Sequence, residues 1–232
     1  MQTRRRWRLL IFDWDGTLFD SIGSIVECTL VTLREIGHPE VEIDDIRGAI
    51  GLGLRETVNL FSPGCDDSMF DRIVQVYRRH WFAKYSHEPF LFPGVEEMLA
   101  GLAEKDYLLA IATAKGRTGL LKDLDRAQLQ QRFHTTRTVD ESPSKPSPQM
   151  LLDIMDELGV APRQSLMIGD TTHDLQMAGN AGVEAVAVCS GSQSRERLLG
   201  EGPIVCLKGV ADLGPWLLSQ QEVTRAESIY RP

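Results

Sequence analysis

The sequence predicts an α/β protein, a doubly wound and mostly parallel sheet with an inserted α-helical cap domain. Three observations lead to this prediction. Short continuous apolar runs recur along the chain, segments with helically spaced apolar residues separate them, and one long helical stretch without a convincing strand follows the first run. Continuous apolar runs are typical of parallel strands that are covered on both faces. Strands that alternate with helices favour the doubly wound arrangement.

The expected strands are unbroken apolar runs that stop at polar or glycine-containing turns. The strongest cover residues 9–13, 107–113, 165–170 and 183–188, and weaker ones cover residues 135–139 and 204–207. The helices expected between them place apolar residues three and four positions apart, over residues 94–104, 148–158 and 173–181.

The helical stretch between the first two strands predicts a cap. Two apolar stripes with helical spacing run through it, one from Ile22 to Leu33 and one from Phe70 to Trp81. We therefore expect a helical cap over residues 20–87, an α/β core over residues 1–19 and 88–218, and a polar tail over residues 219–232.

The composition excludes several classes of protein. The 232 residues include 25 Lys and Arg against 33 Asp and Glu, a net charge of −8, which argues against nucleic acid as a partner. The apolar runs are far shorter than the roughly 20 residues of a membrane helix. The apolar stretch after the N-terminal arginines is too short for a signal peptide, and four well-separated cysteines form neither a disulfide framework nor a zinc site. We expect a cytoplasmic protein with a small-molecule partner, whose oligomeric state the sequence does not indicate.

Two acidic residues follow the first strand. Asp13 and Asp15 are two positions apart, so on a strand they share one face at a spacing of about 6–7 Å. One such carboxylate can attack a group in transfer while the other handles the proton. The alternative, for this motif alone, is a strand that ends in an ordinary Asp-Gly turn.

A second acidic pair, Asp170 and Asp174, follows the strand at residues 165–170. If a helix begins near Thr171, the alternative is that these two acids only cap its positive end. Because ligands bind beyond the carboxyl ends of parallel strands, we expect Asp170 to converge with Asp13 and Asp15. Carboxylates held this close repel one another unless a cation neutralises them. Oxygen ligands without His or Cys favour Mg²⁺.

Two other strand ends offer groups for phosphate. Thr113 ends the second strong strand, and its hydroxyl, together with the backbone N–H groups from Ala114 to Gly116, could hold phosphate oxygens. Lys145 follows the weak strand at residues 135–139 and could add a positive charge. Taken singly, the alternatives are a plain strand-to-helix loop and a solvated lysine.

Together these motifs resemble the haloacid dehalogenase-like superfamily of phosphohydrolases, which has a Rossmann-like core. The pattern DxDGT, then Ser or Thr, then Lys, then GDxxxD corresponds to Asp13 to Thr17, Thr113, Lys145 and Gly169 to Asp174. The resemblance spans roughly residues 9–213, and the helical insert is similar to the small α-helical cap of this family. The segments 51–56 and 92–95 are similar to phosphoglycolate phosphatase-like members, whereas Trp14 departs from the aliphatic residue or Met that is usual there.

The resemblance implies a chemical role for five of the matching residues. Asp13 would attack phosphorus and form an aspartyl-phosphate. Asp15 would protonate the leaving oxygen and then deprotonate the attacking water. Thr113, Ala114 and Lys145 would bind the phosphoryl oxygens.

The resemblance also implies a set of ligands for Mg²⁺. The ion would take side-chain oxygens of Asp13 and Asp170 and the backbone carbonyl of Asp15. Asp174 would act through water or by orienting Lys145. Mg²⁺ and the lysine would together stabilise the charge on the peripheral phosphoryl oxygens.

Asp15 also separates the activities of similar proteins. The resemblance implies that dehalogenases and phosphonate hydrolases lack an acid at this position, whereas phosphatases and sugar phosphomutases keep one. We therefore expect a Mg²⁺-dependent phosphatase that acts on a small soluble phosphomonoester such as phosphoglycolate. The alternative is a phosphosugar mutase on the same scaffold. A third hypothesis, a non-catalytic binding protein, is at odds with a complete set of motif residues.

The cap is expected to select the substrate, with Arg55 as the candidate residue. The sequence Gly51-Leu-Gly-Leu before it predicts a flexible turn ahead of a cation. A guanidinium can bind a carboxylate through two hydrogen bonds, as phosphoglycolate would require. The alternative is a solvated arginine at the start of a helix.

Overall fold

The computed structural model describes residues 6–84 and 91–229, and its strands form one six-stranded parallel sheet. The strands are β1 (Leu9–Phe12), β2 (Leu108–Thr113), β3 (Thr135–Thr138), β4 (Ser165–Gly169), β5 (Glu184–Val188) and β6 (Val205–Leu207). Their order across the sheet is β3-β2-β1-β4-β5-β6. The winding reverses between β1 and β4, and such a switch point is where open sheets bind ligands. The predicted doubly wound sheet is confirmed.

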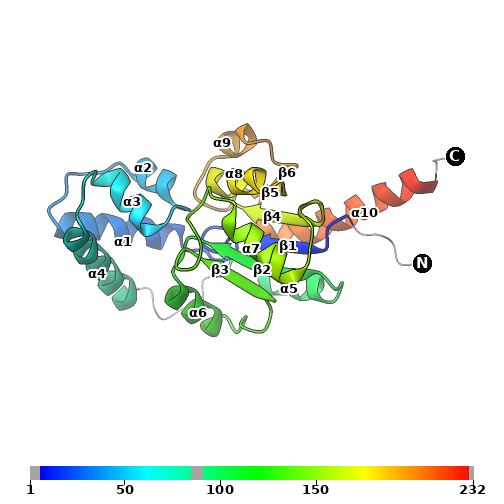
Figure 1. Ribbon diagram of the computed structural model, residues 1–232, viewed down its shortest axis with the longest axis horizontal. Helices are drawn as coiled ribbons and strands as arrows, with labels where there is room; N and C mark the ends of the chain where they lie inside the picture. Colours follow the sequence, from blue (N-terminus) through cyan, green and yellow to red (C-terminus); the bar gives the residue numbers. More distant parts are fainter. Residues whose placement is uncertain (1–5, 85–90, 230–232) are drawn as a thin grey trace.

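Helices cover both faces of this sheet (Figure 1). On one face, apolar side chains are buried by α5 (Val95–Ala103), α6 (Arg117–Arg126) and α10 (Leu213–Ile229). On the other face, they are buried by α7 (Gln149–Leu158), α8 (Thr172–Asn180) and α9 (Arg195–Gly200). Two short 3₁₀ turns, η1 (Pro162–Gln164) and η2 (Val210–Asp212), precede β4 and α10. The sequence predicted the ranges of α5, α7 and α8 and indicated a helix after Gly116, where α6 begins, but α9 and α10 were not predicted.

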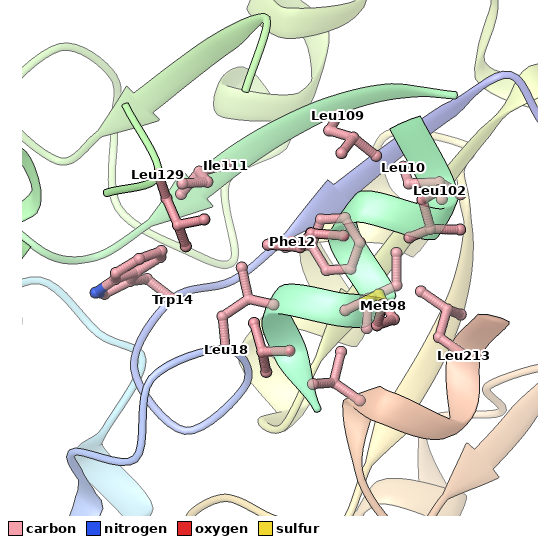
Figure 2. Close-up of a cluster of buried hydrophobic side chains, with 14 of the residues drawn as sticks. Leu10, Phe12, Trp14, Leu18, Met98, Leu102, Leu109, Ile111, Leu129 and Leu213 are labelled. Atoms are coloured by element: carbon pink, nitrogen blue, oxygen red, sulfur yellow. The ribbon is translucent and has the colours of Figure 1, made fainter. Parts of the chain in front are cut away.

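The central strand β1 is continuously apolar because both of its faces are covered. Leu10 and Phe12 belong to the apolar cluster on the α5 face, whereas Leu9 and Ile11 belong to the cluster on the α7 face. All four side chains are fully buried. Figure 2 shows Phe12 among the side chains of the first cluster, with Met98 of α5 beside it. Since both faces of the strand are covered, no position in it tolerates a solvated side chain.

Four helices follow β1 and form the cap region: α1 (Ile22–Glu35), α2 (Ile43–Ala49), α3 (Leu54–Phe61) and α4 (Asp67–Lys84). They lie together at the end of the molecule away from α10 (Figure 1). α1 packs against both α2 and α4. A small apolar cluster of their own, which includes Val26 and Ile46, holds α1 and α2 together. The predicted helical character of this segment agrees with the structure over its described residues.

Some predicted boundaries fall where the structure gives no description. The limit between cap and core at residues 87 and 88 lies outside the described residues, as do Arg4 and Arg5 and the tail residues 230–232. Residues 219–229, expected as a polar tail, continue α10. Within the described part of the chain, no helix combines the length and the apolar character that crossing a membrane requires.

Replacing Leu99 by Ala should lower the free energy of unfolding by about 2–5 kcal/mol, because it leaves a cavity between α5 and the sheet. Leu99 is fully buried in the larger apolar cluster. Urea unfolding followed by circular dichroism measures the change. Leu121→Ala is the matched control, since Leu121 is 52% exposed and its loss should cost less than about 0.5 kcal/mol. Equal losses in the two variants would contradict this assignment of the core.

Candidate active site

The structure brings the predicted core residues to one edge of the sheet. Asp13 and Asp170 directly follow β1 and β4, and Thr113 is the last residue of β2. Lys145 comes from the loop after β3. Because these four strands are neighbours in the sheet, their carboxyl ends deliver the four side chains to the same place.

Lys145 is a buried cation between two buried acids. Its Nζ lies 2.6 Å from Oδ1 of Asp13 and 2.6 Å from Oδ1 of Asp174, and none of the three side chains is more than 3% exposed. Burial alone would lower the pKa of Lys145, but the charges of Asp13 and Asp174 raise it above its usual value. The lysine therefore stays charged and fixes the positions of both carboxylates.

Asp170 sits in a cradle that only glycine permits. Its Oδ1 accepts a hydrogen bond from the Thr17 hydroxyl at 2.8 Å, and its Oδ2 accepts one from the backbone N–H of Ser192 at 2.9 Å. A Cβ at Gly191 would lie 1.9 Å from Oδ2 of Asp170, and a Cβ at Gly16 would lie 2.5 Å from it. Gly16 also has a φ of +86°, which favours glycine. The glycine of the DxDGT motif therefore lets the first turn approach the acid on β4.

Asp174 combines the two roles that the sequence left as alternatives. Its Oδ2 accepts hydrogen bonds from the backbone N–H of Thr171 at 3.1 Å and from the Thr171 hydroxyl at 2.7 Å. The backbone N–H of Asp174 in turn donates to the Thr171 hydroxyl oxygen at 3.2 Å, which completes a capping box at the start of α8. The other oxygen, Oδ1, faces Lys145. Asp174 thus caps the helix with one oxygen and orients the lysine with the other.

The three buried acids could hold a divalent cation. One carboxylate oxygen from each of Asp13, Asp170 and Asp174 lies within 4.8 Å of the others. Burial raises the pKa of Asp13 well above its usual value, against the opposing effect of Lys145, and Asp174 and Asp170 add to the increase. Burial, followed by the charge of Asp174, raises the pKa of Asp170 to about 7. When all three acids are ionised, their negative charge exceeds what the one ammonium balances, and hard oxygen ligands of this kind suit Mg²⁺.

Asp15 belongs to a different charge cluster from Asp13. Its Oδ1 accepts a hydrogen bond from the Ser21 hydroxyl at 2.7 Å and lies 3.0 Å from Nζ of Lys115. Lys115 also lies 3.1 Å from Oδ2 of Asp123, which accepts a hydrogen bond from Nε1 of Trp14 at 3.2 Å. Sequence reasoning singled out neither Lys115 nor Asp123 as a partner of Asp15 or of its cluster. The one available signal was the place of Lys115, two residues after Thr113.

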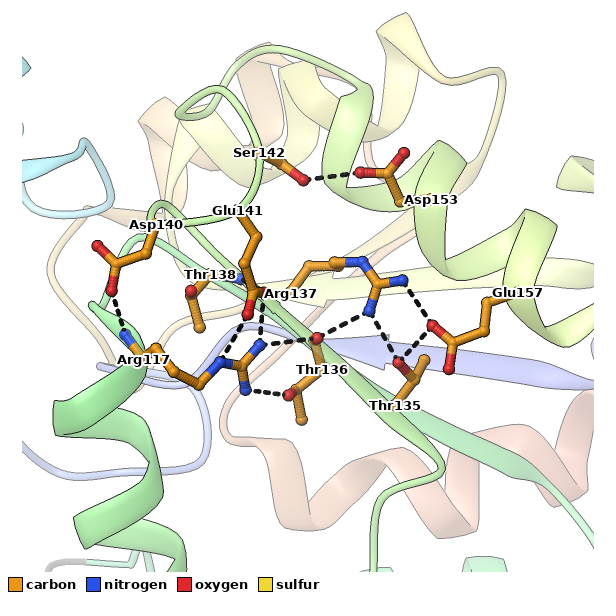
Figure 3. A network of polar contacts seen from close by, with 10 residues as sticks. All are labelled: Arg117, Thr135, Thr136, Arg137, Thr138, Asp140, Glu141, Ser142, Asp153 and Glu157. Carbon is orange, nitrogen blue, oxygen red and sulfur yellow. Dashed lines mark hydrogen bonds and ion pairs between the residues drawn. The ribbon is translucent and has the colours of Figure 1, made fainter.

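A polar network fixes the loop that carries Lys145 (Figure 3). The side chain of Arg117, at the start of α6, bonds to Glu141 in this loop and to the Thr136 hydroxyl on β3. Asp140 in the same loop accepts a hydrogen bond from the backbone N–H of Arg117 at 2.7 Å. The loop after β3 is therefore tied to both α6 and β3, which limits the positions open to Lys145.

A cavity of about 370 Å³ opens between this edge of the sheet and the cap helices. Asp13, Asp15, Thr113 and Ala114 line its core side, and residues from all four cap helices line the opposite side. Four of the residues singled out from the sequence and the cap helices therefore face the same open cavity, whereas Lys145, Asp170 and Asp174 do not line it.

Arg55 does not line this cavity, contrary to the expectation from the sequence. Its guanidinium pairs with Asp67 of α4 at 3.0 Å and lies 3.5 Å from the ring centroid of Phe70. These contacts hold α3 against α4. The structure agrees better with the alternative, a solvated arginine at the start of a helix, because the Arg55 side chain is 42% exposed. Its contacts with α4 add a structural role.

Comparisons with known proteins agree with this geometry. A family model described as haloacid dehalogenase-like hydrolase matches residues 10–188. The chain is 29% identical to phosphoglycolate phosphatase from Pseudomonas syringae pv. tomato, over 97% of this chain and 85% of the relative. It is 34% identical to a protein of Dickeya dadantii named "Probable phosphatase IndB", over 85% of this chain and 87% of the relative. A solved haloacid dehalogenase-like family hydrolase from Streptococcus pneumoniae is 25% identical, with a TM-score of 0.76 over 91% of this chain and 98% of that chain.

Mg²⁺ should raise the melting temperature of the protein more at pH 8 than at pH 5.5. The pKa of Asp170 in the folded protein, about 7, lies above the usual aspartate value, so folded Asp170 keeps its proton up to about pH 7. Without metal, this group lowers stability as the pH rises from about 4 to 7. A bound cation requires the ionised form and offsets that loss. At about 100 times the dissociation constant, binding adds about 2.7 kcal/mol, or roughly 5–10 °C for a chain of this size.

Differential scanning calorimetry with and without Mg²⁺ at the two pH values measures this effect. Asp170→Asn should remove most of the increase at pH 8, while Asp156→Asn, a change at an exposed acid in α7, should leave it intact. An increase that is equal at both pH values would show that Mg²⁺ binds elsewhere.

Proposed function

The chain belongs to the haloacid dehalogenase-like hydrolase family, and on that premise we propose that it is a Mg²⁺-dependent phosphatase that works through an aspartyl-phosphate on Asp13. One observation carries the proposal. Asp13 and Asp15 are adjacent members of one motif, yet Asp13 pairs with Lys145 and Asp15 pairs with Lys115. Two carboxylates in different surroundings can take different chemical roles, one as nucleophile and one as acid and base. The similarity to a protein named phosphoglycolate phosphatase supports a phosphomonoester as substrate.

Asp13 is the proposed nucleophile. Its carboxylate lines the cavity and is otherwise buried, so a phosphoryl group that enters from the cap side meets it directly. Lys145 partly neutralises the carboxylate and the phosphoryl group, which lets one anion approach another. Attack forms a bond from the Asp13 oxygen to phosphorus and breaks the bond from phosphorus to the leaving oxygen.

Thr113 and Ala114 are proposed to hold the phosphoryl oxygens. The Thr113 hydroxyl oxygen accepts a hydrogen bond from the backbone N–H of Lys115 at 3.1 Å. Its hydrogen is then available to donate to a phosphoryl oxygen. Both residues line the cavity beside Asp13, so they orient the phosphoryl group as it is attacked.

Asp15 is the proposed acid and base. It lines the same cavity, so it can give a proton to the leaving oxygen and later take one from the water that attacks the aspartyl-phosphate. Ser21 and Lys115 hold its carboxylate in place. The hydrolytic water thereby regenerates Asp13 and releases inorganic phosphate.

The side chains of Asp13 and Asp170 and the backbone carbonyl of Asp15 are proposed to hold Mg²⁺. The buried acidic cluster that includes the first two supports this assignment. When bound, the cation neutralises charge on the phosphoryl oxygens. Asp174 is proposed to contribute by orienting Lys145, since its Oδ1 lies 2.6 Å from the amine.

Asp13→Asn should reduce the release of inorganic phosphate from a phosphomonoester by at least about 10³-fold, because an amide does not attack phosphorus. Steady-state phosphate release in the presence of Mg²⁺ measures the rate. Rapid acid quench with a radiolabelled substrate should trap a phosphoenzyme in the wild type and none in the variant.

Asp156→Asn is the control for that change, since Asp156 is an exposed acid outside the site. Chelation of the metal should abolish phosphate release, and added Mg²⁺ should restore it. Near-normal turnover of Asp13→Asn would contradict the covalent route. Conversion of a sugar phosphate to its isomer without free phosphate would instead favour the mutase.

Lys115→Met should lower kcat by about 10–100-fold while KM changes little, because it removes the cation that positions Asp15. Both partners of this lysine are acids, and the Lys115 and Asp15 side chains are only 12% and 15% exposed. Lys122→Met is the control, since Lys122 also lines the cavity but is exposed. A loss confined to KM would show that Lys115 binds substrate and does not position the acid.

A further inference from the structure

The cavity has two chemically different ends. Asp13, Asp15 and Thr113 lie at the core end, where the proposed function places the phosphoryl group. Whatever is esterified to that group must extend toward the cap helices, because the same cavity continues between them. The cap end therefore indicates the chemistry of the leaving group.

Apolar side chains dominate the cap end. Ile25 of α1, Ile46 of α2 and Leu54 of α3 line it. Tyr77 and Trp81 of α4 add two aromatic rings, stacked with centroids 6.1 Å apart and planes at 12°. A wall of this composition stabilises a ligand mainly by removing apolar surface from water.

An aromatic ring also lies next to the point where the leaving group departs. The ring centroid of Trp81 is 5.0 Å from Nζ of Lys115, and that nitrogen is 3.0 Å from Oδ1 of Asp15. Asp15 is the residue proposed to protonate the leaving oxygen. The atoms next to that oxygen are therefore within reach of the Trp81 ring.

The same cavity offers little to a carboxylate. Lys115 already bridges Asp15 and Asp123. Arg78 of α4 and Lys122 of α6 line the cavity but are exposed, and Nζ of Lys122 lies 3.9 Å from the ring centroid of Phe82. Ion pairs made by such solvated cations contribute little. Arg126, the last residue of α6, lies at the end of that helix away from Thr113.

We propose that the cavity selects phosphomonoesters whose leaving group carries a bulky apolar ring, in preference to short carboxylated esters such as phosphoglycolate. The inference rests on the proposed phosphatase function and adds the class of substrate to it. A cavity of about 370 Å³ is within the range that holds a ring-bearing ligand, whereas glycolate adds only two carbons and a carboxylate to the phosphoryl group. The apolar wall would be left in water by so small a substrate.

Three esters of primary alcohols test this selectivity with the full chain: 2-phenylethyl phosphate, ethyl phosphate and 2-phosphoglycolate. The first two alcohols have similar acidity, so the leaving groups differ mainly in apolar size. We expect kcat/KM for the phenylethyl ester to exceed those for ethyl phosphate and 2-phosphoglycolate by about 10–100-fold, as burial of one ring would give. Phosphate release in the presence of Mg²⁺ measures all three.

Trp81→Ala connects the selectivity to the cap wall. In this variant, the ratio of kcat/KM for phenylethyl phosphate to that for ethyl phosphate should fall by about tenfold. Leu60→Ala is the matched control, because Leu60 lies on α3 in the same cap but is 57% exposed and does not line the cavity. Its ratio should equal that of the wild type. Circular dichroism verifies that both variants are folded.

The possible results distinguish a failure of the inference from a failure of the proposed phosphatase function. Equal kcat/KM for the phenylethyl and ethyl esters, or a preference for 2-phosphoglycolate, would overturn the inference and leave the phosphatase intact. An unchanged ratio in a folded Trp81→Ala variant would overturn the role of the aromatic wall. No release of phosphate from any of the three esters would overturn the proposed function and the inference together.

Discussion

Three buried carboxylates gathered around one buried ammonium constrain the rest of this structure. Asp13, Asp170 and Asp174 come from two strand ends and one helix start, and Lys145 reaches them from the loop after β3. Such a group is stable only when every polar atom has a partner, since an unpaired buried charge costs several kcal/mol. The capping box of α8 supplies partners to Asp174, and the glycines around Asp170 allow its close approach, while the polar network of the β3 loop holds the segment that carries Lys145. The buried ion pairs of Lys145 thus determine how the side chains at this edge of the sheet are placed.

A second consequence is that two carboxylates two residues apart have different surroundings. Asp13 is enclosed with Lys145, whereas Asp15 lies against Lys115 and Ser21 at the cavity. Trp14, between them, turns the other way into the apolar cluster and donates its N–H to Asp123. The residue that departs from the usual pattern of the motif therefore supports the acid that holds Lys115. Divergent surroundings for adjacent acids are what a nucleophile and a proton carrier require.

The sequence predicted the convergence of those site residues that directly follow a strand. Asp13 and Asp170 follow apolar runs directly, so local pattern and sheet geometry were enough to bring them together. The pairing of Lys115 with Asp123 could not be read in this way, because Asp123 lies within α6 and not at a strand end. The contacts of Arg55 could not be read from the sequence for a similar reason. Its partners, Asp67 and Phe70, lie on α4, and only the packing of α3 on α4 brings them to Arg55, which does not line the cavity.

The arrangement also explains how one scaffold can separate chemistry from selectivity. The groups proposed to act on phosphorus are fixed by the sheet and by buried ion pairs, so changes in the cap need not disturb them. The cap wall has few charges, and its side chains can be exchanged for others of similar volume at modest cost in stability. The cap also has a small apolar cluster of its own, in which Val26 lies away from the cavity lining while Ile46 belongs to both the cluster and the lining. The groups proposed to bind the phosphoryl group thus lie at the edge of the sheet, and the side chains proposed to contact the leaving group lie on the cap helices.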